Sequence, residues 1–403
     1  MPEYNKYLDE LDETNLQVLN ELIASDVDLV GDGNISDLPC HWQHISCVSY
    51  LKESKQKNNA SGQPYLINYY AYRVSYLKLQ SNQLTSLPAS FGNLTQLRRL
   101  QLYDNQLTSL PESFGNLSQL QYLALYRNQL THLPESFGNL SQLKALSLHQ
   151  NQLTSLPDSF GNLNQLRALK LHNNQLSNLP ESFGNLTQLH TLKLYNNQLN
   201  NLPESFGNLT QLQHVILHRN QLTSLPESFG NLSQVQRLSL SENQLSSLPE
   251  SLGNLSQLHT LKVNNNQLKS LPENFSQLSQ LQYVDLHKNQ LTDEIPSSLG
   301  NLDQLHTLNL SYNQFTGEIP ASLGTLAQIR FLHLGGNQLT GEIPEFLWQL
   351  INNNDEHLPT NNYTIYFWHN PQLGGLLSDD LITKYPAITT YPKSLFSNTA
   401  ICY

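Results

Sequence analysis

The stretch from Leu97 to Gln119, L-R-R-L-Q-L-Y-D-N-Q-L-T-S-L-P-E-S-F-G-N-L-S-Q, decides the fold, because close copies of it fill most of the 403-residue chain. Its ninth residue is an asparagine that returns at intervals of 23 residues, and at 24 residues in the last two copies. These asparagines are Asn82, Asn105, Asn128, Asn151, Asn174, Asn197, Asn220, Asn243, Asn266, Asn289, Asn313 and Asn337. A fixed period in this range predicts a solenoid built from stacked repeats.

The first part of each copy has the alternation of a β-strand. Leu100 and Leu102 alternate with Arg99, Gln101 and Tyr103, so the leucines face a core and the other three face the opposite side. One copy cannot bury its apolar residues alone, whereas stacked copies can. We therefore predict one parallel sheet made of a short strand from every copy.

The rest of each copy predicts a turn and a short helical segment. The short amide side chain of Asn105 suits a tight turn, and stacked asparagines would form a ladder between neighbouring turns. Pro111 suits the start of a helical turn. We expect Gly115 and Asn116 to stop this turn early, which leaves a short 3₁₀ or irregular segment.

This unit resembles the leucine-rich repeat, and the resemblance covers almost the whole chain. It implies an α/β solenoid of horseshoe shape, with a parallel concave β-sheet, short 3₁₀ or irregular convex segments and a helical N-terminal cap. Three later stretches resemble the plant-type L-T-G-x-I-P repeat, in which a second short strand forms beside the concave sheet. They span residues 291–296, 315–320 and 339–344.

The chain divides into an N-terminal cap at residues 1–73, about twelve repeats at residues 74–350 and a C-terminal part at residues 351–403 that holds a degenerate last repeat and a cap. Within the first part, apolar residues at helical spacing predict an amphipathic helix. They are Leu8, Leu11, Leu16, Leu19, Leu22 and Ile23. The polar residues 52–62 predict a loop, and the residues from Tyr65 to Tyr76 predict strand.

Two cysteines lie in the predicted N-terminal cap. Cys40, Trp42, Ile45 and Cys47 match the C-x-W-x-x-[IV]-x-C stretch of the plant-type cap, while His44 departs from it. The resemblance implies a Cys40–Cys47 disulfide; reduced thiols, or a zinc site that includes His41 and His44, are the alternatives. The disulfide favours an extracellular or cell-surface location. The lack of a recognisable signal peptide favours a cytoplasmic one.

No motif for catalysis or cofactor binding stands in the sequence. The chain lacks a phosphate-binding loop of the G-x-x-x-x-G-K-[ST] type, an H-E-x-x-H pair and a G-x-S-x-G elbow. The formal net charge is -11, and no apolar run is long enough for a transmembrane helix. We therefore expect a protein without enzymatic activity, cofactor or metal, without a membrane span and without a nucleic-acid partner.

The residues that face the concave side carry the information about function. They differ from one copy of the repeat to the next, whereas the leucines, asparagines and other core residues are nearly the same in every copy. The concave-side residues are rich in Tyr, His, Lys and Arg, and Tyr and Arg are enriched at protein interfaces. The candidate binding residues are Tyr103, Tyr122, Tyr126, His149, His172, Lys170, Lys193, Tyr195, His218 and Arg219. We expect a scaffold that binds a protein or peptide there. An inhibitor or regulatory subunit of an enzyme, such as a glycan-degrading one, and a binder of glycans or polyanions are the alternatives.

Overall fold

The computed structural model describes residues 10–11, 13–23, 45–58, 64–347, 364–367 and 369–374. The chain folds as two compact units, Met1–Leu192 and Lys193–Tyr403, with the boundary inside strand β8 (Thr191–Lys193). Cys40 lies outside the described residues, as does Cys402. The Cys40–Cys47 disulfide therefore stays a prediction.

The predicted amphipathic helix is present as α1 (Glu13–Ile23) but is shorter than predicted, because Leu11 lies in strand β1 (Glu10–Leu11), while Leu8 lies outside the described residues. The helix side chains Val18, Leu19 and Leu22 are fully buried, which confirms the apolar face expected from the sequence. The buried Asn15 accepts a hydrogen bond of 2.9 Å on its Oδ1 from the backbone N–H of Val74. This bond joins the helix to the strand that precedes the first complete repeat. The cap role and the three-part division of the chain remain predictions.

A long antiparallel hairpin follows the helix. Strands β2 (Ile45–Asn58) and β3 (Pro64–Lys78) pair from Ile45 opposite Leu77 to Asn58 opposite Pro64, and β1 (Glu10–Leu11) adds to β3 in parallel. The loop predicted for residues 52–62 is therefore wrong as far as Asn58. The polar side chains of this stretch favoured a loop. The structure forms a strand instead, because the backbone of these residues pairs with that of the continuous strand β3.

Each repeat contributes one three-residue strand to a parallel sheet. In the first unit these are β4 (Arg99–Gln101), β5 (Tyr122–Ala124), β6 (Ala145–Ser147) and β7 (Ala168–Lys170), which follow β3 in order. In the second unit they are β9 (His214–Ile216), β10 (Arg237–Ser239), β11 (Thr260–Lys262), β12 (Tyr283–Asp285), β13 (Thr307–Asn309), β14 (Phe331–His333) and β16 (Thr364–Tyr366). Paired residues are one repeat apart, so equivalent side chains form columns across the strands.

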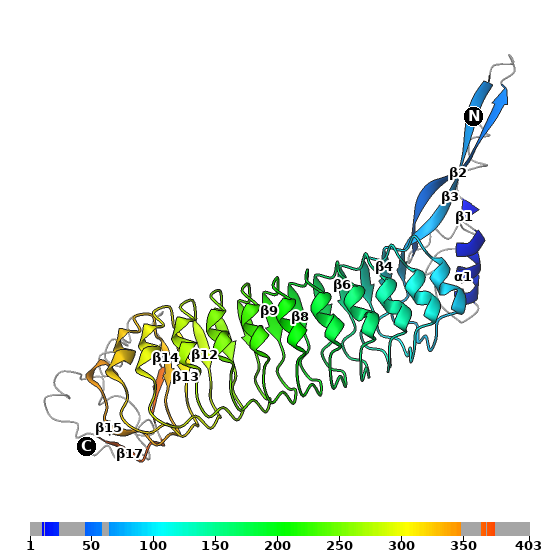
Figure 1. Ribbon diagram of the computed structural model, residues 1–403. Helices are drawn as coiled ribbons and strands as arrows, with labels where there is room; N and C mark the ends of the chain where they lie inside the picture. The colour runs from blue at the N-terminus through cyan, green and yellow to red at the C-terminus, as the bar shows by residue number, and fades with distance from the viewer. Residues whose placement is uncertain are drawn as a thin grey trace, which may run out of the picture. The chain divides into compact units, whose positions relative to one another are not determined.

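A 3₁₀ segment follows each strand from β3 to β13, drawn as a coiled ribbon in Figure 1. The first unit has η3 (Ala89–Asn93), η4 (Glu112–Asn116), η5 (Glu135–Asn139), η6 (Asp158–Asn162) and η7 (Glu181–Asn185). The second has η8 (Glu204–Asn208), η9 (Glu227–Asn231), η10 (Glu250–Asn254), η11 (Glu273–Gln277), η12 (Ser297–Asn301) and η13 (Ala321–Thr325). A proline stands immediately before each one, as the sequence predicts.

In the 3₁₀ segments η3–η9 and η11, a phenylalanine fills the space between sheet and segment. Phe137, Phe160 and Phe183 are fully buried, and their rings stack in near-parallel planes with centroids 6.2 Å apart. In the later segment η10 the same place is taken by Leu252, which is also fully buried. The core therefore accepts a leucine at this position.

Phe160→Leu is expected to lower the free energy of unfolding by about 1 kcal/mol, because a leucine side chain fills most of the space of the ring. Phe160→Ala should cost about 3–5 kcal/mol, because it leaves a cavity between two other buried rings. Urea denaturation followed by circular dichroism measures both. Equal losses for the two variants would contradict the packing role.

The ladder of asparagines predicted from the sequence is confirmed. Asn105 donates from Nδ2 to the carbonyl oxygens of Leu79 and Leu102, at 2.7 and 2.9 Å. Its Oδ1 accepts from the backbone N–H groups of Asn82 and Leu84, both at 3.0 Å. Each such side chain thus completes backbone groups of the repeat before its own.

The ladder continues through the degenerate last repeat of the second unit. Asn370 is fully buried, and its Oδ1 accepts from the N–H of Leu339 at 3.1 Å. Over the described residues this last repeat has a strand, β16, followed by the turn that holds Asn370. A separate pair of parallel strands, β15 (Thr340–Glu342) and β17 (Gln372–Gly374), forms where the plant-type resemblance implies a second strand.

Candidate functional site

The first and third residues of each strand lie on the sheet face away from the core, here called the open face. In β5, Leu123 is 3% exposed, whereas Tyr122 is exposed and Ala124 is half-buried. The side chain two residues after each strand, as at Tyr126, continues this face. The predicted candidate residues occupy these positions, apart from Arg219, which stands one residue farther along the chain.

In the first unit the structure brings four predicted residues into one stack. The ring centroids of Tyr103 and Tyr126 are 4.5 Å apart, those of Tyr126 and His149 4.6 Å, and those of His149 and His172 4.3 Å. Neighbouring planes differ by 15° or less. Parallel pairing of successive strands produces this stack, because strands lie about 4.8 Å apart. Burial raises the pKa of the Tyr126 hydroxyl.

Two other groups on this face are already engaged with neighbours. Arg99 lies over the ring of Tyr122 at 4.7 Å from its centroid, as a cation–π pair. Arg127 forms an ion pair with Asp104 at 3.5 Å and donates to Gln150 Oε1 at 3.1 Å. Tyr122 remains 41% exposed despite the arginine, so its ring edge is accessible. Lys170, the third residue of β7, is half-buried.

The second unit contains the remaining candidate residues. Tyr195 and His218 stack at 4.6 Å, and Lys193 lies in the strand before Tyr195. Arg219 has a positive φ of 57° and donates from Nε to both carboxylate oxygens of Glu242, at 3.0 and 3.1 Å. Burial, with the charge of Arg219 beside it, lowers the pKa of His218, which favours a neutral ring in the stack.

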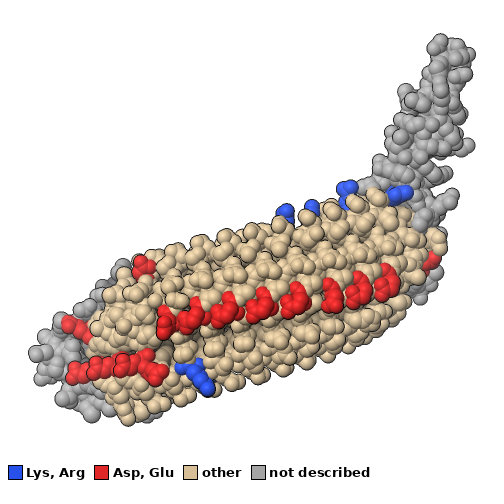
Figure 2. All heavy atoms as spheres, viewed as in Figure 1, with Lys and Arg blue, Asp and Glu red and all other residues tan. Residues whose placement is uncertain are grey.

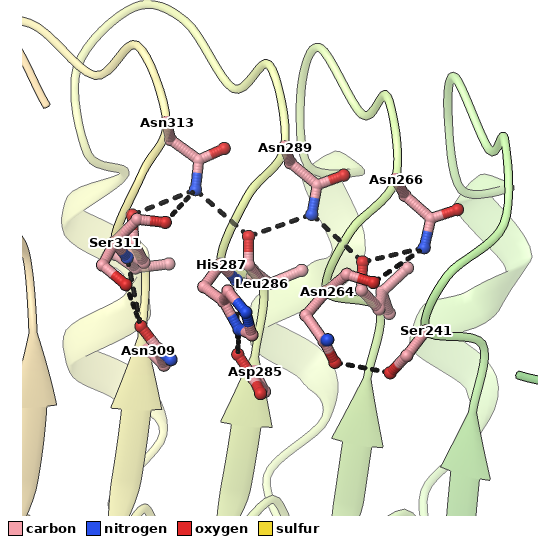
Figure 3. Close-up of polar contacts among 12 residues, drawn as sticks. Ser241, Asn264, Asn266, Asp285, Leu286, His287, Asn289, Asn309, Ser311 and Asn313 are labelled. Atoms are coloured by element: carbon pink, nitrogen blue, oxygen red, sulfur yellow. Dashed lines mark hydrogen bonds and ion pairs between the residues drawn. The ribbon is translucent and has the colours of Figure 1, made fainter. Parts of the chain in front are cut away.

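Beyond His218, the position two residues after successive strands of the second unit carries Ser241, Asn264, His287 and Ser311, which form polar contacts that the sequence did not reveal (Figure 3). Ser241 donates to Asn264 at 2.5 Å and Ser311 donates to Asn309 at 2.6 Å. Asp285 is 8% exposed and its Oδ1 lies 2.7 Å from Nδ1 of His287. The sequence spacing could have predicted this pair, because His287 follows Asp285, the last residue of β12, by two positions.

The carboxylates of the 3₁₀ segments form rows away from the open face. Glu112, Glu135, Asp158 and Glu181 open successive segments of the first unit and are exposed (Figure 2). Within the described ranges, no group of three His, Cys, Asp or Glu residues is arranged to hold a metal ion. None of the described helices is long and apolar enough to cross a membrane.

Comparison with known proteins adds a family and several similar structures. A family model described as a leucine-rich repeat region matches residues 50–171, 157–247 and 227–352. No curated protein matches the chain. A leucine-rich repeat protein from Leptospira interrogans is similar, with 26% identity and a TM-score of 0.60, over 81% of this chain and 95% of that one.

Two further similar structures are longer than this chain. The PEPR1–AtPEP1 structure shares 29% identity with a TM-score of 0.72, over 96% of this chain and 54% of that one. A TDR receptor shares 32% identity with a TM-score of 0.62, over 68% of this chain and 49% of that one. The chain therefore spans about half the length of each of these two proteins.

Proposed function

The chain belongs to the leucine-rich repeat family, and from this premise we propose that it is a non-enzymatic recognition scaffold. Its ligand is a protein or a peptide, bound on the open face of the sheet. The likeness to the PEPR1–AtPEP1 structure and to a TDR receptor supports a binding role over a catalytic one. The core residues form a fixed frame, so the residues that define the ligand are those of the open face.

The observation that carries this proposal is the stack of Tyr103, Tyr126, His149 and His172 on the sheet face away from the core. A core needs none of these rings, because the leucines on the other face already fill it. Rings fixed by stacking lose little conformational freedom when a ligand covers them, which favours binding. Tyrosine is also among the residue types that dominate interface energetics.

Tyr126→Ala is expected to weaken binding of the physiological partner about 30-fold, which corresponds to about 2 kcal/mol for a central interface tyrosine. The partner is first identified by cross-linking and mass spectrometry in the source organism, and affinity is then measured by isothermal titration calorimetry. Thermal unfolding of the variant shows whether the fold survives, as expected for a side chain outside the core.

Two variants serve as controls for Tyr126→Ala. Tyr126→Phe keeps the ring between Tyr103 and His149 and removes only the hydroxyl, so it separates stacking from hydrogen bonding. Glu135→Ala changes an exposed carboxylate in a 3₁₀ segment and should leave affinity within about twofold. Loss of binding with Glu135→Ala but not with Tyr126→Ala would place the partner elsewhere and reject the proposed face.

A further inference from the structure

We infer that the open face of the first unit selects an extended acidic peptide segment, an inference that rests on the proposed function and specifies its ligand. The segment crosses strands β4–β7, and its backbone lies over a strip of small side chains in β5, β6 and β7. The carboxylates of the peptide form ion pairs with a row of Lys and Arg side chains at the starts of the strands. The stack of tyrosines and histidines borders the strip on the other side.

Charge is separated within the first unit. Eight Lys and Arg residues stand between positions 73 and 192, and all of them lie in a strand or within three residues of one. Five Asp and Glu residues stand in the same range, and four of them open 3₁₀ segments. The fifth, Asp104, already pairs with Arg127. The strand side of an acidic protein is therefore locally basic.

The cations at the strand starts form one edge, here called the basic edge: Arg98, Lys144 and Arg167. Backbone hydrogen bonds of 2.9 Å join Gln121 to Arg98, Lys144 to Gln121 and Arg167 to Lys144, so these residues stand side by side just before strands β4–β7, with Gln121 between Arg98 and Lys144. Among the described residues, none of the three has an ion-pair partner, and the same holds for Lys170 on the open face. A carboxylate partner would satisfy them.

Four of the eight open-face positions in β4–β7 carry small side chains, and the other four are Arg99, Gln101, Tyr122 and Lys170. Ala124, Ala145, Ser147 and Ala168 occupy open-face positions of β5, β6 and β7, and all are half-buried. Ala145 and Ser147 stand two residues apart, a distance of roughly 7 Å along a strand. Such a strip admits the backbone of one extended chain close to the sheet, flanked by rings on one side and by cations on the other.

The same features favour a peptide over a densely charged polyanion. At least three cations of the unit are already engaged: Lys78 by the ring of Tyr76, Arg99 by the ring of Tyr122 and Arg127 by Asp104. The basic edge is interrupted by the neutral Gln121, and alanines separate it from Lys170. Polyanion binding relies on many simultaneous charge contacts. A few cations beside aromatic rings instead suit a ligand that combines scattered carboxylates with apolar groups.

The test is a selection of random twelve-residue displayed peptides on the full-length protein and on the variant Lys144→Glu with Arg167→Glu. Peptides selected on the unaltered protein are expected to be enriched in Asp and Glu, and those selected on the variant in Lys and Arg. Fluorescence anisotropy with the strongest acidic peptide should show a loss of more than about tenfold in the variant, because like charges then face each other. Lys269→Glu in the second unit reverses an exposed charge outside the open face and should change nothing.

Three outcomes would overturn the inference. Selected peptides without acidic enrichment, weakened by Tyr126→Ala but not by the charge reversals, would reject the acidic ligand and keep the proposed face. A fluorescent heparin hexasaccharide that binds more tightly than every selected peptide, and is lost in the Lys144→Glu and Arg167→Glu variant, would assign the edge to a polyanion. Selection of no peptide above background would reject the inference together with peptide recognition by this face.

Discussion

Asn151→Ala is expected to lower the free energy of unfolding by about 3 kcal/mol, because one buried N–H loses its acceptor, at about 1–3 kcal/mol, and two buried carbonyls each lose one of two asparagine donors, at about 0.5–1.5 kcal/mol each. Asn151 Oδ1 accepts from the N–H of Leu130 at 3.0 Å. Its Nδ2 donates to the carbonyl oxygens of Leu125 and Leu148, at 3.0 and 2.9 Å. Alanine supplies none of these contacts, and the site is too buried for water to replace all of them.

Urea denaturation measures the total loss, and hydrogen exchange locates it. The amide of Leu130 should exchange much faster in the variant, whereas amides several repeats away should change little, since each repeat contacts only its neighbours. Asn164→Ala is the matched control, because Asn164 is an exposed asparagine in the same repeat. A stable Asn151→Ala protein with normal exchange at Leu130 would show that the ladder contributes no stability.

Gly138→Ala is expected to destabilise the first unit by about 3 kcal/mol or more, which is large for the addition of one methyl group. A Cβ atom at Gly138 would lie 2.3 Å from the carbonyl oxygen of Ser159 and 2.6 Å from its Cβ. The obstacle is mainly backbone of the next repeat, so it cannot be relieved by a rotation of a side chain. The two 3₁₀ segments η5 and η6 would have to separate.

The chain offers its own control for this substitution. Ser276 stands in the place of the glycine in η11, before the first repeat of 24 residues. Ser276→Ala should change the free energy of unfolding by no more than about 0.5 kcal/mol. Differential scanning calorimetry of both variants compares the two positions directly. A Gly138→Ala protein that melts like the unaltered chain would contradict the close approach of neighbouring segments.

The repeated strands, turns and 3₁₀ segments were predictable, because each is determined by residues within a single repeat. Leucine alternation predicts a strand, a proline predicts the start of a 3₁₀ segment, and Asn105 predicts both the turn and the ladder. The reason for the glycine was not predictable. The sequence suggests that Gly115 ends a helical turn, whereas the structure places Gly115 inside η4 and against Ser136 of the next repeat. Packing between repeats is not visible in a single repeat.

The candidate site was predictable as a set of columns but not in its contacts. Equal spacing predicts that Tyr103, Tyr126 and His149 lie side by side, and the stacking distances agree. The sequence does not tell which charges are already paired, as Arg219 is with Glu242, because these contacts depend on side-chain conformations. Residues on the open face are also free of the constraints of the core, so the frame that predicts the fold carries no information about the partner.

The direction of the asparagine ladder has a consequence for synthesis on the ribosome. The N–H of Leu130 lacks its side-chain acceptor until Asn151 has been synthesised, 21 residues later. The N–H of Leu107 depends on Asn128 in the same way, over the same interval. A nascent chain therefore always carries one unfinished repeat at its growing end. At about 5–20 residues per second, the next asparagine arrives within roughly one to five seconds. Folding thus follows translation from the N-terminal side at a lag of one repeat, and a chain released early ends in exposed backbone donors.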